Sequence, residues 1–144
     1  MIKSILIRNS FFFFISLSFL LANFEKEFQT KLILVESGDT LEIPIGKQQI
    51  LGTLSLDGKN NIVIRGMGID KSILSFQSQE DGAEGLKIIN CKNIKLENFT
   101  IQDTKGDGIK VQETDGITFL KVKAEWTIGP NPKKREERKK KEIE

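Results

Sequence analysis

One pattern of apolar residues occurs twice in the second half of the chain, at a fixed spacing of 23 residues. The two copies lie between Gly85 and Ala124, and all six apolar positions of the first copy are apolar in the second. Within each copy the apolar residues alternate in short pairs, which is the period of a β-strand and not of a helix. The repeat therefore predicts three short strands per copy, each paired with its equivalent in the next copy. The matched positions are Leu86 with Ile109, Ile88 with Val111, Ile94 with Ile117, Leu96 with Phe119, Phe99 with Val122, and Ile101 with Ala124.

Turn-forming residues separate the apolar pairs inside each copy. Asn tolerates a positive φ angle and Gly adopts it without a steric penalty, so both suit tight corners. Three short strands joined by such corners describe one coil of a parallel β-helix, with neighbouring coils about 4.8 Å apart. The predicted corner residues are Asn90, Asn93, Asn98, Gly106, Gly108 and Gly116.

An earlier copy of the same pattern lies 32 residues upstream of the first. Because this offset is nine residues longer than the repeat, we predict an insertion between Asp70 and Gln79. Its apolar residues predict an extra strand that leaves the coil, and Gly66-Met67-Gly68 predicts a corner just before it. The upstream copy consists of Leu54, Leu56, Ile62, Ile64, Met67 and Ile69, and the insertion holds Ile73, Leu74 and Phe76.

The stretch from Leu54 to Gly68, with Gly108 to Val111 and Gly116 to Phe119, resembles the right-handed parallel β-helix repeat proteins of the pectate-lyase-like superfamily. The resemblance covers residues 41–126 and implies an all-β, right-handed parallel β-helix of about three coils. It also implies a polysaccharide as partner, because many members bind, cleave or epimerise polysaccharides. Fold does not determine activity, so the resemblance predicts the architecture more sharply than the function.

The first 22 residues are typical of an export signal. Lys3 and Arg8 precede an apolar run from Phe11 to Ala22 that is shorter than the roughly 18 residues of a membrane-spanning helix. A buried strand or helix is the alternative. Ala22 suits a cleavage site and Leu20 does not, so the segment is either removed or kept as an anchor, the only membrane contact we expect. The expected location is the periplasm, the cell surface or the medium.

Residues 23–53 are expected to form an N-terminal cap and the first strands. Phe24 to Lys31 is polar and suits a spacer or part of the cap, whereas Leu32-Ile33-Leu34-Val35 and then Leu41/Ile43/Ile45 predict strands. A cap is needed because the open end of a β-helix exposes apolar core and unpaired backbone groups. The coils are expected to follow at residues 54–126.

Residues 127–144 are predicted to form a disordered charged tail. From Asn131 to Glu144 there are seven Lys or Arg, four Glu and one apolar residue. The tail carries a formal +3 and the leader +2, so the remainder is −3, which argues against a nucleic-acid partner. Lys, Glu and Arg share purine-only codons, so we hypothesise that the chain is a truncated β-helix protein. Its open end, near Ile117 to Ala124, would then favour self-association.

Few residues in the chain suit catalysis. There is no His and no Tyr, and the only Arg between leader and tail is Arg65. The 23-residue register places Glu80 opposite Asp103 and Glu84 opposite Asp107, so these carboxylates are expected at one corner of adjacent coils. A cation would relieve their repulsion, which predicts a Ca²⁺ site. Solvated turns that bind nothing are the alternative interpretation.

Two functions remain open from the sequence. The first is an exported, non-catalytic or incomplete β-helix domain that serves at most as a surface or carbohydrate-contact module. The second is a Ca²⁺-dependent polysaccharide lyase or epimerase with Lys87 or Lys110 as the base. Such enzymes need a base and a cation to stabilise developing charge, so the missing His and Tyr favour the first.

A single cysteine and a single tryptophan carry separate predictions. Cys91 is the only cysteine, which excludes an intramolecular disulfide and leaves a buried small residue or a free thiol able to dimerise the chain. Trp126 is expected to pack over the last coil as a partial lid.

Overall fold

The computed structural model describes residues 24–128, which form a parallel β-solenoid of about four turns. The predicted leader and nearly all of the predicted tail lie outside the described residues. One helix, residues 24–34, precedes the strands, and within residues 24–128 no helix is long and apolar enough to cross a membrane. The strands are β1 (Thr40–Glu42), β2 (Gly46–Gln49), β3 (Leu54–Asp57), β4 (Asn60–Arg65), β5 (Ser72–Ser75), β6 (Leu86–Ile89), β7 (Lys92–Gln102), β8 (Ile109–Gln112) and β9 (Asp115–Glu125).

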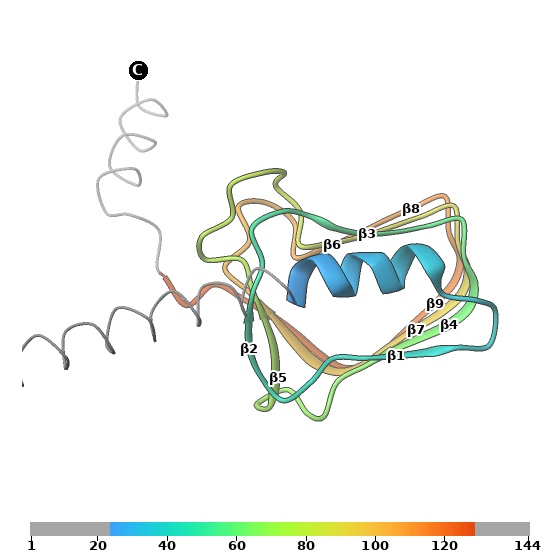
Figure 1. The fold of residues 1–144 in the computed structure, drawn as a ribbon, viewed down its shortest axis with the longest axis horizontal. Helices are drawn as coiled ribbons and strands as arrows, with labels where there is room; N and C mark the ends of the chain where they lie inside the picture. Colours follow the sequence, from blue (N-terminus) through green and yellow to red (C-terminus); the bar gives the residue numbers. More distant parts are fainter. Residues whose placement is uncertain (1–23, 129–144) are drawn as a thin grey trace, which may run out of the picture.

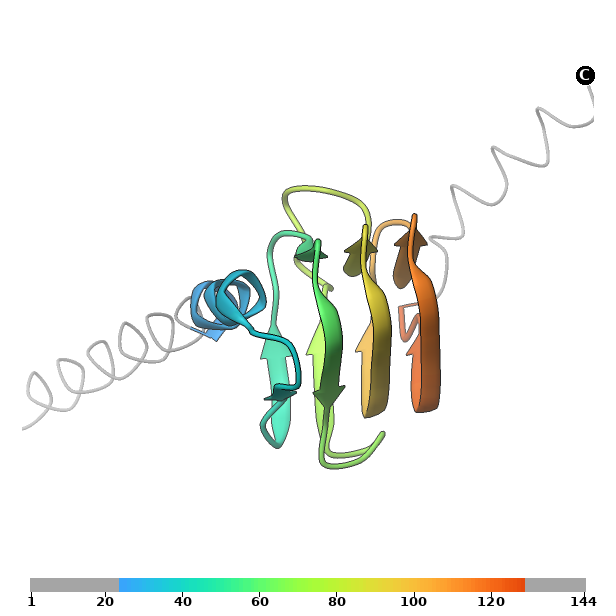
Figure 2. The same cartoon turned by 90° about the vertical axis from the view of Figure 1, so that its right-hand side faces the viewer.

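The strands form two sheets that run along the axis of the solenoid. The larger has the order β1-β4-β7-β5-β2 with β9 added to β7, and the smaller has the order β3-β6-β8. Every pair is parallel. Strand β7 bends around a corner, so one part pairs with β4 and the other with β5. Figure 1 shows the turns superimposed down the axis, and Figure 2 shows them side by side.

The predicted 23-residue register is confirmed at all six positions. The two matched pairs of the smaller sheet join β6 to β8, and the other four join β7 to β9. The six repeat residues of β6 and β7 point into a continuous core, where each is at most 1% exposed. These buried residues are Leu86, Ile88, Ile94, Leu96, Phe99 and Ile101.

The upstream copy is confirmed in its first four positions, and the predicted insertion is wrong in its place and shape. Leu74, not Ile69, stands opposite Ile101, so β5 is the third strand of its own turn and does not leave the coil. The offset between paired residues is 32 at β4–β7, 27 at β5–β7 and 23 at β6–β8. The extra residues are therefore split between the β4–β5 corner and the β5–β6 loop. Met67 and Ile69 lie in that corner and are 45% and 38% exposed.

Several corners require the residues that occupy them. A Cβ on Gly66 would lie 2.2 Å from the backbone oxygen of Asn98, so this corner of the second turn accepts only glycine without movement. Gly106 and Gly108 are not among the described residues with positive φ angles. The predicted corner residues that do have positive φ angles are Asn90, Asn93, Asn98 and Gly116.

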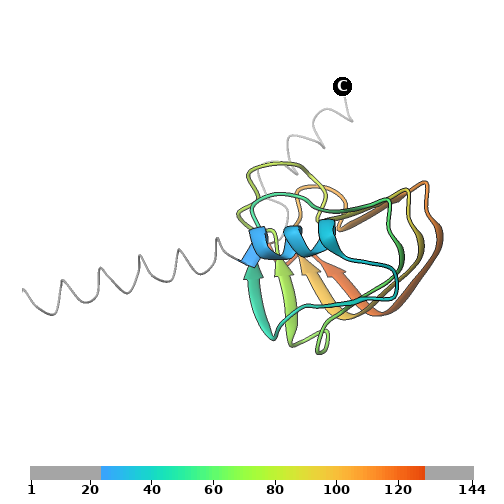
Figure 3. The same cartoon turned by 45° about the vertical axis from the view of Figure 1, so that its right-hand side comes forward.

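The N-terminal helix covers the first turn of the solenoid. Strands had been predicted from Leu32 to Val35, but the helix continues to residue 34 and that prediction is wrong. Phe28 and Leu32 lie on one face of the helix, and both are buried against the core together with Val35, which follows the helix directly. The helix crosses the end of the solenoid in Figures 1 and 3, so a helix lies where the N-terminal cap was predicted.

The helix also forms hydrogen bonds with the backbone at the outer edge of β3 and just before this strand. The side-chain amide of Gln29 donates to the Ser55 oxygen at 2.9 Å and accepts from the Ser55 nitrogen at 2.8 Å, as a neighbouring strand would. The carboxylate of Glu25 accepts from the nitrogens of Leu51 and Gly52 at 2.8 and 2.9 Å. The helix therefore covers the apolar core at the N-terminal end and bonds part of the backbone edge there, whereas β1 and β2 have no outer strand partner among residues 24–128.

The single cysteine lies inside the solenoid. Cys91 is 4% exposed, and its sulfur lies 3.1 Å from the oxygen of Ile89. The interpretation of Cys91 as a buried small residue is confirmed.

Candidate functional site

The predicted carboxylate corner contains an ion pair between adjacent turns. The Lys110 ammonium lies 2.9 Å from Oε1 of Glu84. Lys87 and Lys110 are paired in register on β6 and β8, as expected. The hydrogen bond from Lys110 holds the pKa of Glu84 below its ordinary value, and the same bond raises the pKa of Lys110. At neutral pH both groups are therefore charged.

Asp103 is held by the residues that follow the last strand. Its Oδ1 accepts from the Thr127 nitrogen at 2.6 Å and from the Ile128 nitrogen at 3.2 Å, and its Oδ2 accepts from the Thr127 hydroxyl at 2.6 Å. Partial burial raises the pKa of Asp103, but these hydrogen bonds outweigh it and the net pKa is lowered. Asp103 thus fixes the chain where it leaves β9.

Glu80 and Asp107 are tied into the structure through their backbones. The Glu80 nitrogen donates to the Leu51 oxygen at 2.7 Å, and the Asp107 oxygen accepts from the Gly85 nitrogen at 2.9 Å. In residues 24–128 no three His, Cys, Asp or Glu side chains are grouped so that they could hold a metal ion. The Ca²⁺ site stays a prediction, with Glu84 and Asp103 bound to protein partners in this structure.

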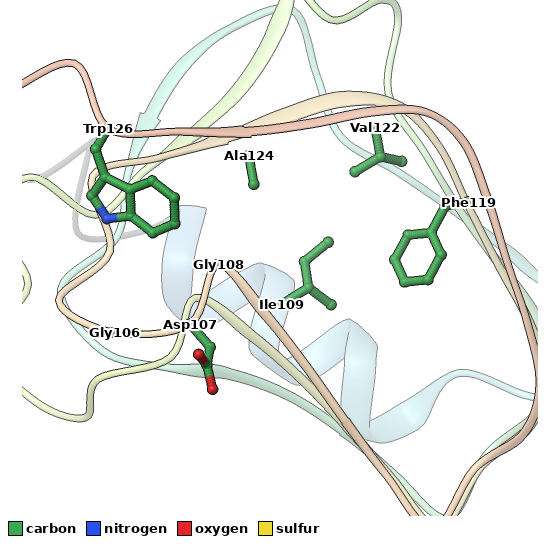
Figure 4. Close-up of a pocket in the computed structure, with 8 residues that line it drawn as sticks. All are labelled: Gly106, Asp107, Gly108, Ile109, Phe119, Val122, Ala124 and Trp126. Atoms are coloured by element: carbon green, nitrogen blue, oxygen red, sulfur yellow. The ribbon is translucent and has the colours of Figure 1, made fainter.

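The open C-terminal end of the solenoid forms an apolar hollow of about 450 Å³. Ile109, Phe119, Val122 and Ala124 point into it from the last turn, and Trp126 stands at its rim (Figure 4). These side chains continue the core rows of the preceding turn, but no further turn covers them within the described part of the chain. Phe119, which is half exposed, stands in register with fully buried Leu96.

Trp126 lies where a partial lid had been expected. Its indole Nε1 donates to the Thr104 oxygen at 2.8 Å, which fixes the ring at one side of the hollow. The side chain is 56% exposed and lines only the rim. Trp126 therefore shields one part of the last turn and leaves the region around Phe119 uncovered.

The outer edges of β8 and β9 have no strand partner among residues 24–128. Strand β8 pairs only with β6, and β9 pairs only with β7. Strand β9 spans 11 residues, so its outer edge presents a long row of backbone donors and acceptors. The hollow and this edge form the open end, which lies opposite the helix-capped end in Figure 2.

An ion-pair cluster that the sequence analysis missed lies on the outer face of the larger sheet. Glu97 is 4% exposed. Its Oε1 lies 2.5 Å from Nε of Arg65, and its Oε2 lies 2.6 Å from Nζ of Lys95. Hydrogen bonds from Lys95, and then from Arg65, lower the pKa of Glu97. Both oxygens of Glu97 are thus used by neighbouring side chains.

The capping residues were also missed, although a signal for them exists. Phe24, Phe28, Leu32 and Val35 have the three- and four-residue spacing of a helix, and Gln29 follows directly after a buried position.

Comparison with protein-family models, with curated proteins and with solved structures finds no match to this chain.

Proposed function

We propose that this chain is a non-catalytic β-solenoid module of an exported protein, related in fold to the pectate-lyase-like superfamily, that binds a β-strand of a partner at its open end. The observation that carries this proposal is the difference between the two ends. The first turn is covered by a helix with dedicated hydrogen bonds, whereas the last turn presents Phe119 and Val122 beside an unpaired strand edge. Strand addition uses both features, because backbone bonds give affinity and apolar pockets give selectivity.

The charge state of Lys110 supports binding over catalysis. A general base for proton removal works best when its pKa lies near the operating pH. The contact with Glu84 raises the pKa of Lys110, which moves this candidate base in the opposite direction. Of the two bases proposed for a polysaccharide lyase or epimerase, Lys110 is therefore held in the protonated form.

A strand peptide tests the proposal. The probe copies β7, Lys92–Gln102, whose apolar residues match the rows of the open end. Trp126 is the only tryptophan of the chain and stands at the rim, so its fluorescence reports on this end. We expect a saturable blue shift of Trp126 emission when the peptide is added to the full chain.

The control peptide replaces Ile94, Leu96 and Phe99 by Ser, which keeps the backbone and the charges but removes the apolar contacts. We expect no shift with the control. An unchanged Trp126 spectrum with the first peptide contradicts strand binding. In a parallel assay, Ca²⁺-dependent formation of unsaturated product from a uronic-acid polymer, lost in Asp107→Asn, would contradict the non-catalytic assignment.

A further inference from the structure

We propose that the partner at the open end is a second copy of this chain, and that two copies form a closed pair, open end to open end. This inference rests on the strand-binding function proposed above. It identifies the occupant and predicts that the assembly stops at two.

The composition of residues 129–144 makes them a poor cover for the hollow. Of these sixteen residues, seven are Lys or Arg and four are Glu, and Ile143 is the only residue with a large apolar side chain. Covering Phe119 and Val122 requires apolar surface, since burying charged groups against them is costly. A second open end offers the same apolar residues and an unpaired strand edge.

The charge of the last turn permits contact between like surfaces. Residues 105–126 hold four lysines and four acidic residues, so this turn is formally neutral. Two copies can therefore approach without net repulsion between their last turns. The charged residues are Lys105, Asp107, Lys110, Glu113, Asp115, Lys121, Lys123 and Glu125.

The capped end limits the assembly to two copies. Head-to-tail stacking would place the open end of one copy on the first turn of the next, which the helix of residues 24–34 already covers. The Gln29 amide also occupies the backbone groups of Ser55 that a stacked strand would use. Head-to-tail stacking could use the free edges of β1 and β2 but would bury no apolar core at the helix-covered end, so the two-fold, isologous contact between open ends is favoured. Such a contact closes instead of growing into a fibre.

The two-fold contact also suits the backbone. A two-fold axis perpendicular to both the solenoid axis and β9 brings β9 of one copy antiparallel to β9 of the other. Antiparallel pairing forms well-aligned hydrogen bonds and satisfies edges that parallel stacking leaves open at the end of the chain. The two hollows then face each other and form one shared apolar core.

The mass of the full chain in solution tests the proposal. We expect light scattering to show a reversible change from one to two chains of 16.3 kDa as concentration rises, with no larger species. Trp126 emission should shift to the blue over the same concentration range. A chain that stays single at every concentration, or that grows continuously, overturns the proposal.

A matched pair of variants on β9 locates the contact. Phe119→Asp places a charge in the hollow and should hold the chain as a single copy. Leu120→Asp changes the next residue, which is similarly exposed but stands in register with Glu97 on the outer row, and should still pair. Equal loss of pairing in both variants, each checked by circular dichroism, contradicts a contact at the hollow. If Phe119→Asp does not fold, the change of Trp126 emission on dilution of the wild-type chain tests the contact at the hollow instead.

A variant of the cap tests closure. Gln29→Ala removes both hydrogen bonds that hold the helix to Ser55, which frees this edge and loosens the helix over the first turn. Head-to-tail contacts then become available, and assemblies larger than two should appear. A strict pair in Gln29→Ala would contradict the role of the cap in stopping growth. Binding of the β7 peptide by a chain that never pairs would overturn the closed pair and leave the strand-binding function standing, whereas failure of both would overturn both.

Discussion

The open end predicts that two isoleucines in the same row of the core contribute very differently to stability. Ile94 of β7 and Ile117 of β9 are paired in register, one turn apart. Ile94 is 1% exposed, whereas Ile117 is only partly buried against the core. Replacing Ile94 by Ala leaves an enclosed cavity and should lower the free energy of unfolding by about 3 kcal/mol. The same change at Ile117 removes fewer contacts and opens no enclosed cavity, so about 1 kcal/mol is expected.

Thermal melts of the two variants, followed by circular dichroism at a concentration where the chain is single, check this difference. For a folded unit of about 100 residues, each kcal/mol lowers Tm by about 5 °C. We therefore expect Tm to fall by about 15 °C for Ile94→Ala and about 5 °C for Ile117→Ala. Equal decreases would refute the reasoning, because they would mean that the last turn is covered as fully as the one before it.

Three further predictions concern the corner, the charges and the cap. Gly66→Ala should lower Tm by several degrees, because the new Cβ meets the backbone of the next turn. Gly58→Asn should leave Tm nearly unchanged, since Asn90 occupies the equivalent corner one turn later. Similar decreases in Tm for both variants would contradict this explanation. Because the pKa of Glu97 is lowered in the folded chain, the unfolded chain binds more protons at acid pH. The contribution of the Glu97 carboxylate to the free energy of unfolding is therefore present above pH 4.5 and is lost as the pH falls through the folded pKa. Urea unfolding at pH 7 and pH 3.5 should therefore show a smaller pH effect in Glu97→Gln than in wild type, and an unchanged effect would refute the assignment. Gln29→Glu keeps the acceptor for the Ser55 nitrogen but loses the donor to the Ser55 oxygen. Chemical unfolding should therefore show a decrease of about 1 kcal/mol or more in the free energy of unfolding. An unchanged free energy of unfolding would contradict the strand-like pairing.

The stacking of the turns could be predicted from the sequence because the same row of residues is apolar in each turn. The six positions of the 23-residue repeat are paired in the structure as the spacing indicated. The register is strongly specified, since a slip by one residue would turn the apolar side chains of Ile94 and Leu96 outward. Corners at Asn90 and Asn93 were predictable for a related reason, because few residue types tolerate a positive φ angle.

The errors arose where two periods compete over a short segment. Leu32 to Val35 is a continuous apolar run that suits a strand, but Phe28 one helical turn earlier makes it the end of an amphipathic helix. In the second turn, Ile69 and Leu74 both satisfy the apolar pattern. Only the packing of the β4–β5 corner decides between them, and it leaves Ile69 exposed.

The candidate site was less predictable than the fold. Register placed Glu84 and Asp103 in neighbouring corners, but it could not show that Lys110, Thr127 and Ile128 bind their carboxylates. These contacts depend on side-chain directions and on the path of the chain after β9. The open end itself follows from the repeat, because a last turn always leaves one face of the core uncovered unless another segment closes it.

Residue-resolved hydrogen exchange of the full chain tests the central claim, that one end of the solenoid is covered and the other is open. At dilution we predict slow exchange along β7 and fast exchange at alternate amides of β9, whose outward N–H groups have no partner in the described structure. At high concentration the same β9 amides should become protected as two copies pair. Slow exchange along all of β9 at every dilution would contradict an open end, and fast exchange along β7 would contradict the stacked solenoid.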